Sequence, residues 1–458
     1  MTQEPQNIPR QTIEKQVNVA QTGDNNTQNN TFILEAVKKA AIPFSLPPSN
    51  VTFFAGRDGD LAKVHSLLQQ NQRLAVSAFV KGMGGVGKTE LAIQYALGHV
   101  LQEYRGGVCW LQTSSDLALQ VKDFVRVQLH EKVPDDLDTG VKIAAYCWKM
   151  LADRLANLAG EGCRFLVILD DVKADYEQAI RPYLPPMDGG FAVLATTRLE
   201  LGQAMQQYRL DVLAIEAAVD LLKSFLGPED RRRAEDEAIK KLCEWLGRLP
   251  LAVELVGRYL ARKPDLTIAQ MQERLNQKRL LQDALTDQQR RALAEMTGKL
   301  NILAAFELSW QELSVGAKQV ASALGLFALA PLPWGWVEAV CSAMDAETLE
   351  NIRDEELLNL HLLERSEQGM YQLHQLIREY FQFQLQQNPT QSSTLRQQVA
   401  AFLLTIAKGI GQTITQEQNS CFCPRHPPPR PAQPRDARRY CRPRRGFSLG
   451  FSGCCQVL

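Results

Sequence analysis

The sequence predicts an α/β fold in its first half, with a parallel sheet covered by helices on both faces, and a mostly helical second half. Stretches long enough for helices separate short apolar runs of strand length, which is the pattern of a parallel sheet. Apolar runs of strand length end near residue 215, and the residues that follow show the apolar spacing of helices. At 458 residues the chain has room for about three domains. The predicted strands are residues 74–80, 107–112, 165–169 and 191–195.

The elements divide the chain into seven predicted segments. Residues 1–31 are rich in Asn, Gln and Thr and are expected to be disordered, because they contain few apolar anchors. A helix at 33–41 and a Pro-interrupted linker make up residues 32–50. The α/β domain follows at 51–214, an all-helical domain at 215–297, and a third domain at 298–385 with a short strand at 370–373. Residues 386–420 begin another helical region, and 421–458 form an Arg-, Pro- and Cys-rich tail expected to be disordered.

Charge and hydropathy exclude several classes of protein. The 51 basic and 51 acidic residues cancel, so net charge gives no reason to expect membrane or nucleic-acid binding by the whole protein. The balance hides an acidic body, since residues 1–420 contain 43 basic and 50 acidic residues while the tail contains eight Arg and one Asp. The N-terminus lacks the apolar run of a signal peptide. The apolar run at 320–330 would span about 16 Å as a helix, too short for a bilayer core of about 30 Å.

Half of the cysteines are scattered singly through apolar text, as buried thiols in a reducing compartment would be. We therefore expect a cytoplasmic protein with no membrane segment. These cysteines are Cys109, Cys147, Cys163, Cys243 and Cys341.

Residues 82–89 read GMGGVGKT and match the phosphate-binding pattern G-x-x-x-x-G-K-[ST] between a predicted strand and a predicted helix. Such a loop closes its backbone N–H groups around phosphates, and the helix N-terminus adds partial positive charge. Lys88 would reach the β- and γ-phosphates, and the Thr89 hydroxyl would ligate Mg²⁺. A chance Gly-rich turn is the weaker interpretation, because strand and helix flank the loop as the motif requires. The loop residues expected to contact the phosphates are Gly82, Gly84, Gly85, Val86 and Gly87.

Two carboxylates follow the apolar strand at 165–169, namely Asp170 and Asp171. Asp170 is predicted to hold Mg²⁺ through water, and Asp171 to orient or deprotonate the attacking water. Without the Gly-rich loop, a surface Asp pair at the end of a strand would be the better interpretation.

The fourth predicted strand ends in ATTR, which places Arg198 at the carboxyl edge of the sheet. Side chains at that edge face the ligand crevice of a parallel sheet, so Arg198 could sense a γ-phosphate through charge-assisted hydrogen bonds. The alternative is a solvated Arg in a loop.

Taken together, these motifs resemble the NB-ARC family, the signal-transducing ATPases that include plant disease-resistance proteins, the apoptotic protease-activating factor and bacterial relatives. The resemblance covers residues 51–384, and GMGGVGKT, FLVILDDV and ATTR carry it. FAGRD at 54–58 is similar to the family's motif on the adenine side, which implies that Gly56 and Arg57 bind nucleotide. LGRLPLA at 246–252 resembles its GLPLA motif, whose proline, here Pro250, packs near the base.

Further motifs of the third domain complete the resemblance. Residues 301–310 and 326–337 are similar to the start of the family's winged-helix domain. LHQL at 373–376 resembles the MHD motif, which implies that His374 contacts the ADP β-phosphate. Gln375 stands where the family has aspartate, so the lock on the ADP state is expected to be looser.

The resemblance implies an α/β P-loop parallel-sheet nucleotide-binding domain followed by an all-helical ARC-type domain and a winged-helix domain. It implies a switch that holds ADP in a closed form and exchanges it for ATP, with Mg²⁺, to open and self-associate in signalling or defence. Hydrolysis would be slow and would reset the switch. Two rivals remain: an AAA+-like DNA-associated ATPase or transcription regulator, and a scaffold that holds ADP without hydrolysing it. Nucleic-acid binding is disfavoured because residues 300–385 are not conspicuously basic.

Both ends of the chain lie outside these motifs. Residues 16–31 are Asn/Gln-rich, contain no proline and resemble amyloid signalling motifs, so they could stack with an effector protein, although a solvated linker is the simpler interpretation. The tail at 421–458 could be taken for zinc ligands or an RNA-binding arm. Its abrupt change of composition favours a frameshift near Ser420 that truncates the chain before C-terminal helical repeats.

Overall fold

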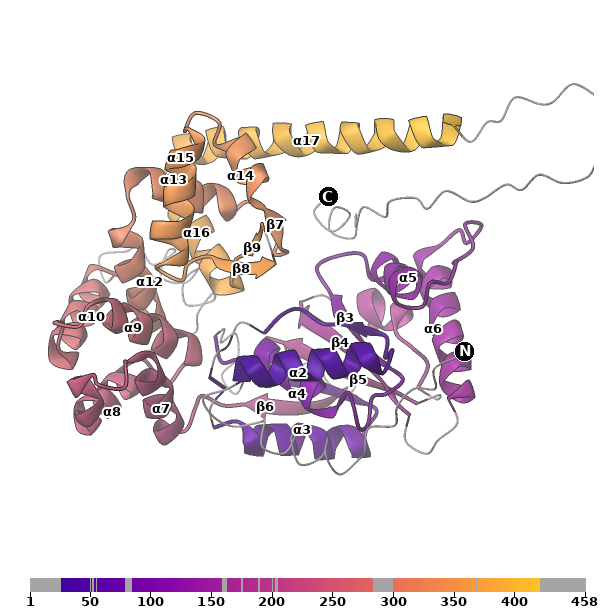
Figure 1. Cartoon of the computed structure of the whole chain (residues 1–458), viewed down its shortest axis with the longest axis horizontal. Coiled ribbons are helices and arrows are strands. Elements are labelled where there is room, and N and C mark those ends of the chain that lie inside the picture. Colours follow the sequence, from indigo (N-terminus) through magenta and orange to yellow (C-terminus); the bar gives the residue numbers. More distant parts are fainter. Residues whose placement is uncertain are drawn as a thin grey trace, which may run out of the picture. The chain divides into compact units, whose positions relative to one another are not determined.

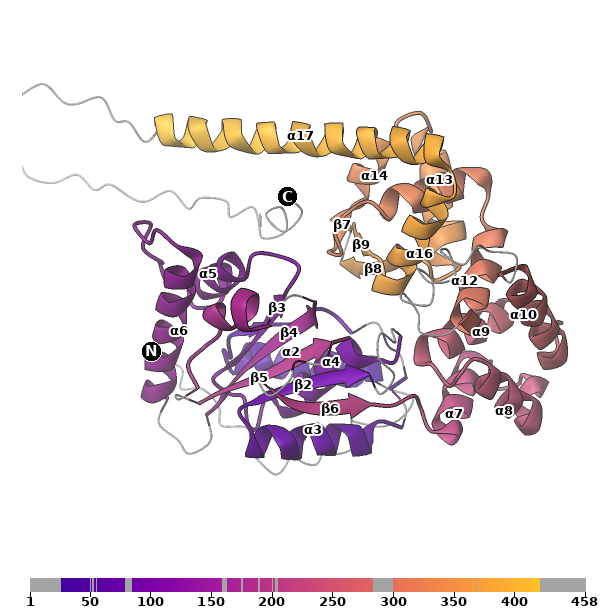
Figure 2. The same ribbon diagram turned by 180° about the vertical axis from the view of Figure 1, so that it is seen from behind.

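The computed structural model describes residues 26–49, 51, 53–54, 56–78, 85–158, 163–173, 176–187, 190–199, 201, 205–282, 300–367 and 369–420 (Figures 1 and 2). The chain forms two compact units. The first contains the residues up to Val315 together with Asp354–Glu364, and the second contains Gly316–Arg353 and the residues from Arg365 onward.

A six-stranded sheet, in which every pairing is parallel, is the centre of the first unit. The predicted parallel α/β fold is therefore confirmed. The order is β1-β3-β4-β5-β2-β6, and the four strands predicted from apolar runs are β2 to β5. The strands are β1 (Phe44–Ser45), β2 (Arg73–Ala78), β3 (Gly107–Gln112), β4 (Phe165–Val172), β5 (Phe191–Thr197) and β6 (Gln206–Leu210).

The two edge strands are absent from the sequence prediction, for different reasons. β1 has two residues inside the Pro-interrupted linker, too few to show a periodic pattern. β6 reads QQYRL, and of its five residues only Leu210 is buried. An edge strand has a neighbouring strand on one side only and is more exposed, so fewer of its residues need to be apolar. The central strands β4 and β5, in contrast, are almost wholly buried.

Helices cover the sheet. The helix α2 packs against α4, and in Figure 1 both lie in front of the strands. On α5 and α6, apolar side chains join the sheet in a buried core where Trp148 meets Phe191 edge to face, with ring centroids 5.7 Å apart. The indole N–H of Trp148 donates to the carbonyl oxygen of Tyr183 at 2.7 Å, so this buried aromatic has its polar atom paired. These helices are α2 (Asn26–Lys39), α3 (Asp58–Gln70), α4 (Lys88–His99), α5 (Leu117–Gln128) and α6 (Gly140–Asn157).

The first described helix begins earlier than predicted. Residues 26–31 were expected to be disordered and the helix to run over 33–41, whereas α2 spans Asn26–Lys39. Asn30, Ile33 and Val37 are buried at helical spacing, so packing against the α/β domain outweighs the weak helix propensity of the Asn- and Thr-rich text. Residues 1–25, which include most of the expected stacking segment, lie outside the described residues.

Beyond the sheet, the first unit continues as a group of helices, as predicted from residue 215 onward. The contacts that join them are α7 with α8 and α9, and α10 with α12. The unit extends to Val315, past the predicted boundary at 297, because α12 packs against α9 and α10. The helices are α7 (Ile215–Phe225), α8 (Asp236–Trp245), α9 (Pro250–Arg262), α10 (Ile268–Gln282) and α12 (Leu300–Glu312).

The second unit combines a small sheet with helices. Its three strands have the order β7-β9-β8, and β9 corresponds to the strand predicted at 370–373. The last helix runs 32 residues and packs through its first half, where Phe402 meets Trp336 edge to face at 5.8 Å. The elements are α13 (Val315–Leu324), β7 (Leu332–Pro333), α14 (Trp334–Val340), α15 (Ala346–Asn351), β8 (Glu364–Glu367), β9 (Met370–Gln372), α16 (Gln375–Gln386) and α17 (Pro389–Ser420). The tail from residue 421 lies outside the described residues.

Among the helices that the structure describes, none is both long enough and apolar enough to span a bilayer.

The segment Asp354–Glu364 returns the chain to the first unit, where His361 contacts α9. Arg258 Nη1 donates to His361 Nε2 at 3.3 Å, and His361 has a left-handed backbone with φ of +53°. Burial, together with the nearby charges of Arg258 and Arg262, lowers the pKa of His361 to about 4.

His361 is therefore expected to make the protein acid-sensitive. The unfolded histidine has a pKa near 6.5, so the unfolded state binds more protons between about pH 6.5 and pH 4, and stability falls as pH drops through that window. The variant His361→Asn, which tolerates the left-handed backbone, should lose less stability over this range. Urea unfolding of both proteins at several pH values measures the difference, and parallel curves would contradict the assignment.

Candidate phosphate-binding site

The Gly-rich loop joins β2 to α4, as the motif requires, and its described part begins at Gly85. Gly82 and Gly84 lie outside the described residues. Gly87 caps α4 with a left-handed φ of +93°, a conformation that glycine adopts without a steric penalty. The N-cap residue Gly87 makes no side-chain cap hydrogen bond, and the N-terminus of α4 carries the partial positive charge that attracts an anion.

Arg57 is hydrogen-bonded to the backbone of this loop. Its side chain is buried, with Nη2 donating to the carbonyl oxygen of Val86 at 3.0 Å and Nη1 donating to Asp60 Oδ2 at 2.9 Å. The hydroxyl of Tyr208 donates to the other oxygen of Asp60. Arg57, predicted from the family resemblance to bind nucleotide, is thus placed against the backbone of the phosphate loop.

Gly56 precedes Arg57 in a position that excludes a side chain. Its φ is +62°, and a Cβ built there would lie 2.3 Å from the Cβ of Ala217 on α7. The turn that leads into α3 through its N-cap residue, Arg57, therefore depends on this glycine.

Gly56→Ala is expected to destabilise the protein by more than the roughly 1 kcal/mol that a left-handed alanine costs, because the contact with Ala217 adds a clash. Gly59→Ala is the matched control, since its Cβ would meet no atom within 4 Å in the first turn of α3. Alanine there should stabilise by roughly 0.5–1 kcal/mol. Denaturant unfolding measures both, and equal shifts would contradict the steric argument.

The first carboxylate, Asp170, is buried at the end of β4 and is held by two hydroxyls. Thr89 Oγ1 donates to its Oδ1 at 3.0 Å and Thr196 Oγ1 donates to the same oxygen at 2.7 Å. Burial raises the pKa of Asp170, against the lowering effect of these hydrogen bonds. The Thr89 hydroxyl keeps its lone pairs for a metal while its proton points to Asp170, so the oxygen donors present fit Mg²⁺.

The second carboxylate, Asp171, lies in a bulge of β4. Between Leu169, opposite Ala195, and Val172, opposite Thr197, β4 contains one residue more than β5. Asp171 takes up the extra length with a left-handed φ of +56°. Bulges re-aim side chains, and both carboxylates of this one interact electrostatically with Lys88.

Two threonines that the sequence prediction did not single out fix this bulge. Thr196 Oγ1 accepts the backbone N–H of Asp171 at 2.9 Å while it donates to Asp170. Thr113 Oγ1 lies 3.0 Å from the carbonyl oxygen of Asp170 and 2.8 Å from that of Asp171. Thr196 stands in the ATTR text beside Arg198 and was within reach of sequence reasoning, whereas nothing around Thr113 indicates its role.

Lys88, Arg198 and both aspartates interact electrostatically. Burial, with a smaller contribution from Arg198, lowers the pKa of Lys88 to about 8, although Asp171 and Asp170 act in the opposite direction. The site thus holds two cations beside two carboxylates, and an added phosphate would offset the cost of keeping Lys88 charged.

The two residues assigned through the family resemblance, Pro250 and His374, are placed in different units. Pro250 opens α9, and its Cγ lies 4.0 Å from where a Cβ of Gly87 would be, so the first residue of α9 borders the phosphate loop. His374 belongs to the second unit, where it caps α16 and its Nδ1 accepts the backbone N–H of Leu376 at 3.2 Å.

The linker between β1 and α3 also contacts α4, which the sequence did not predict. Ser49 Oγ donates to Glu90 Oε1 at 2.7 Å, and Gln94 donates to the same oxygen at 2.7 Å. Burial raises the pKa of Glu90. The linker is thereby tied to the first turns of α4.

Comparison with known proteins agrees with this geometry. The NB-ARC domain family matches residues 57–232. The regulatory protein AfsR of Streptomyces griseus is 29% identical over 347 residues, which are 73% of this chain and 32% of AfsR. The probable disease resistance protein RF45 of Arabidopsis thaliana is 30% identical over 227 residues, covering 46% of this chain and 21% of that protein. The chain spans about a third of the length of AfsR and less of RF45.

Similar solved structures are distant. The Walker-type ATPase PABY2304 of Pyrococcus abyssi covers 72% of this chain at 12% identity with a TM-score of 0.35, a likeness too weak to bear on function. The identification therefore follows from the sequence relatives and from the loop, carboxylates and arginine described above. This chain carries an NB-ARC domain at residues 57–232 and is a relative of bacterial regulators and plant disease-resistance proteins.

Proposed function

We propose that this chain is a nucleotide-controlled switch of the NB-ARC type, which binds ADP or ATP with Mg²⁺ and hydrolyses ATP slowly. The observation that carries the proposal is the cluster of Lys88, Thr89, Asp170, Asp171 and Arg198 where α4 begins. Helix dipole, lysine and arginine supply positive charge for phosphates, while threonine and aspartate supply oxygen ligands for a hard cation. This combination is the one required to bind a nucleoside triphosphate with its metal.

Each residue of the cluster has a separate task in the proposal. Gly85, Val86 and Gly87 present backbone N–H groups to the phosphates, and Lys88 pairs with the β- and γ-phosphates. Thr89 and Asp170 hold Mg²⁺, which neutralises phosphate charge when bound. Asp171 positions the attacking water, and Arg198 senses the γ-phosphate.

The proposed switch also uses the second unit, whose three-stranded sheet and helices are consistent with a winged-helix domain. His374 would contact the ADP β-phosphate in a closed form, and exchange for ATP would release it. Each nucleotide must bind one form better than the other for such a switch to work. The open form would self-associate in the cytoplasm and act in signalling or defence, with residues 16–31 as a contact for an effector protein.

The direct test is to purify the protein, denature it and identify the nucleotide that is released. We expect ADP in near-equal molar amount, and self-association on exchange for a slowly hydrolysed ATP analogue, seen by light scattering. Protein that releases no nucleotide and binds neither ADP nor ATP would refute the proposal.

Replacement of His374 is expected to accelerate ADP release, because the closed form loses a contact to the β-phosphate. The variant His374→Asn keeps a side chain that can cap α16, so the comparison isolates the nucleotide contact from the capping role. Stopped-flow release of a fluorescent ADP measures the rate. An unchanged rate would leave His374 with its capping role alone.

A further inference from the structure

We propose that Asp60 and Tyr208 are positioning residues that act through Arg57 to aim the backbone of the phosphate loop at the nucleotide. Asp60 accepts hydrogen bonds from Arg57 and from Tyr208, and Arg57 also donates to Val86 in the loop. Asp60 and Tyr208 both lie outside the recognisable sequence motifs. The inference deepens the proposed function, on which it rests, and concerns how the phosphate site is held ready for its ligand.

The carbonyl oxygen that Arg57 holds belongs to the peptide that joins Val86 to Gly87. Nη2 of Arg57 donates to this oxygen at 3.0 Å. The peptide is trans, and in a planar trans peptide the C=O and the N–H point in opposite directions. The N–H of Gly87 is therefore directed away from Arg57, at the end of α4 that attracts an anion. Holding one side of the peptide thus aims the other side.

The loop needs such a restraint because of its glycines. Gly85 and Gly87 have φ values of +74° and +93°, and glycine loses more backbone freedom than other residues when it is fixed. A loop that becomes ordered only when nucleotide binds loses this freedom at the expense of affinity, whereas a loop already fixed in its binding geometry does not. The bond from Arg57 to Val86 therefore contributes to affinity in its own right.

Asp60 keeps the guanidinium of Arg57 in place. Arg57 is 5% exposed, so its charge needs a partner, and its Nη1 donates to Asp60 Oδ2 at 2.9 Å. The donors of a guanidinium are fixed in one plane, so the contact with Asp60 also sets the direction in which Nη2 reaches Val86. Tyr208 on β6 donates to the other oxygen of Asp60. The edge strand, the first turn of α3 and the phosphate loop are thereby joined by one chain of hydrogen bonds.

The test is the affinity for ADP, pyrophosphate and adenosine, each measured by competition with a fluorescent ADP. Asp60→Asn removes the charge that holds Arg57 and is expected to raise the Kd of ADP roughly tenfold, while Tyr208→Phe, which removes one hydroxyl, should raise it about threefold. Pyrophosphate should lose affinity by the same factors, because it occupies the loop. Adenosine carries no phosphate and should bind both variants as it binds wild type.

The variant Arg57→Lys separates the aiming of the loop from the charge of the side chain. Lysine keeps the positive charge, but its single ammonium group cannot span Asp60 and Val86 in the fixed geometry of a guanidinium. Arg57→Lys should therefore also raise the Kd of ADP roughly tenfold. In this background Tyr208→Phe should have no further effect, because it acts through Arg57. A residue that acted by charge alone would keep its ADP affinity as lysine.

Tyr176→Phe is the matched control, because it removes a hydroxyl from an arginine-tyrosine contact remote from the loop. The Tyr176 hydroxyl accepts from Arg73 Nη1 at 3.0 Å. Arg73 opens β2, whereas the phosphate loop follows the other end of that strand. Tyr176→Phe should bind ADP as wild type does. Thermal unfolding of the nucleotide-free proteins checks that each variant is folded, and Tyr208→Phe decides the test if Asp60→Asn is not.

The outcomes separate the two proposals. If Tyr208→Phe binds ADP as tightly as wild type, or if adenosine loses affinity together with ADP, the inference is overturned and the proposed function stands. If wild type binds neither ADP nor ATP, the proposed function itself falls, and the inference falls with it.

Discussion

Lys88→Ala is expected to abolish the stabilisation that ADP or ATP gives to the protein. Ligand that binds only the folded state stabilises it by about 2.7 kcal/mol at a concentration of 100 times Kd. Lys88 is the cation at the start of α4 and interacts with Asp170, Asp171 and Arg198, so its loss would remove the main cation of the proposed phosphate site. Thermal unfolding with and without ADP measures the effect.

In the absence of nucleotide, Lys88→Ala is not expected to lower the stability of the protein. Burial lowers the pKa of Lys88 to about 8, which means that the folded state disfavours its charge. Lys88→Ala should then be at least as stable as nucleotide-free wild type at pH 7. Lys142→Ala controls for loss of an exposed lysine and should retain the full shift with ADP. A variant that still gains stability from ADP would contradict the assigned site.

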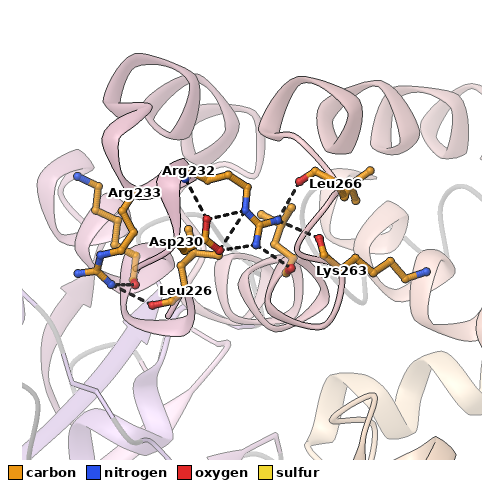
Figure 3. Close-up of polar contacts among 8 residues, drawn as sticks. Leu226, Asp230, Arg232, Arg233, Lys263 and Leu266 are labelled. Atoms are coloured by element: carbon orange, nitrogen blue, oxygen red, sulfur yellow. Dashed lines mark hydrogen bonds and ion pairs between the residues drawn. The ribbon is translucent and has the colours of Figure 1, made fainter. Parts of the chain in front are cut away.

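Arg232→Met is expected to cost about 3–5 kcal/mol, the usual effect of breaking a buried ion pair. Arg232 is buried at 2% exposure, pairs with Asp230, and donates to the carbonyl oxygens of Leu260, Lys263 and Leu266 (Figure 3). Removing the guanidinium leaves these three carbonyl oxygens without this donor and leaves Asp230 with the backbone N–H of residue 232 but without its charged partner. It would also detach the turn before α8 from the end of α9.

Arg231→Met is the matched control, because Arg231 is the exposed neighbour in the same 3-10 turn, η3 (Arg231–Ala234). It should change the free energy of unfolding by less than about 0.5 kcal/mol. Urea denaturation gives both values. Similar values for the two variants would mean that the hydrogen bonds drawn in Figure 3 contribute little.

The sequence alone predicts where those candidate site residues lie that belong to a recognisable motif. Both aspartates and Arg198 stand at the ends of strongly apolar strands, so a parallel sheet is enough to predict that they lie at the same edge. Contacts between segments that are distant in the chain could not be predicted from the sequence. Thr113 reaches β4 from the end of β3, and Ser49 reaches Glu90 across 41 residues, and neither leaves a periodic or compositional signal.

Two other features escaped prediction for physical reasons. The bulge at Asp171 requires knowledge of the register between β4 and β5, which no single strand reveals. Arg232 stands in the run RRR, which by composition suggests a solvated basic patch, yet its middle member is buried because three backbone acceptors and Asp230 surround it. Burial of one residue in a charged run depends on tertiary structure alone.

The strand β1 has a practical consequence for anyone who expresses this domain alone. A fragment cut to residues 57–232 would lose α2 and β1, since both precede its first residue. The backbone of β3 pairs with Phe44 and Ser45 on that side, and Val108 N–H bonds the carbonyl oxygen of Pro43. Without them β3 becomes a bare edge that can recruit a strand from another molecule. A fragment designed to stay in solution should therefore begin at or before Asn26, so that β1 still covers this edge of β3.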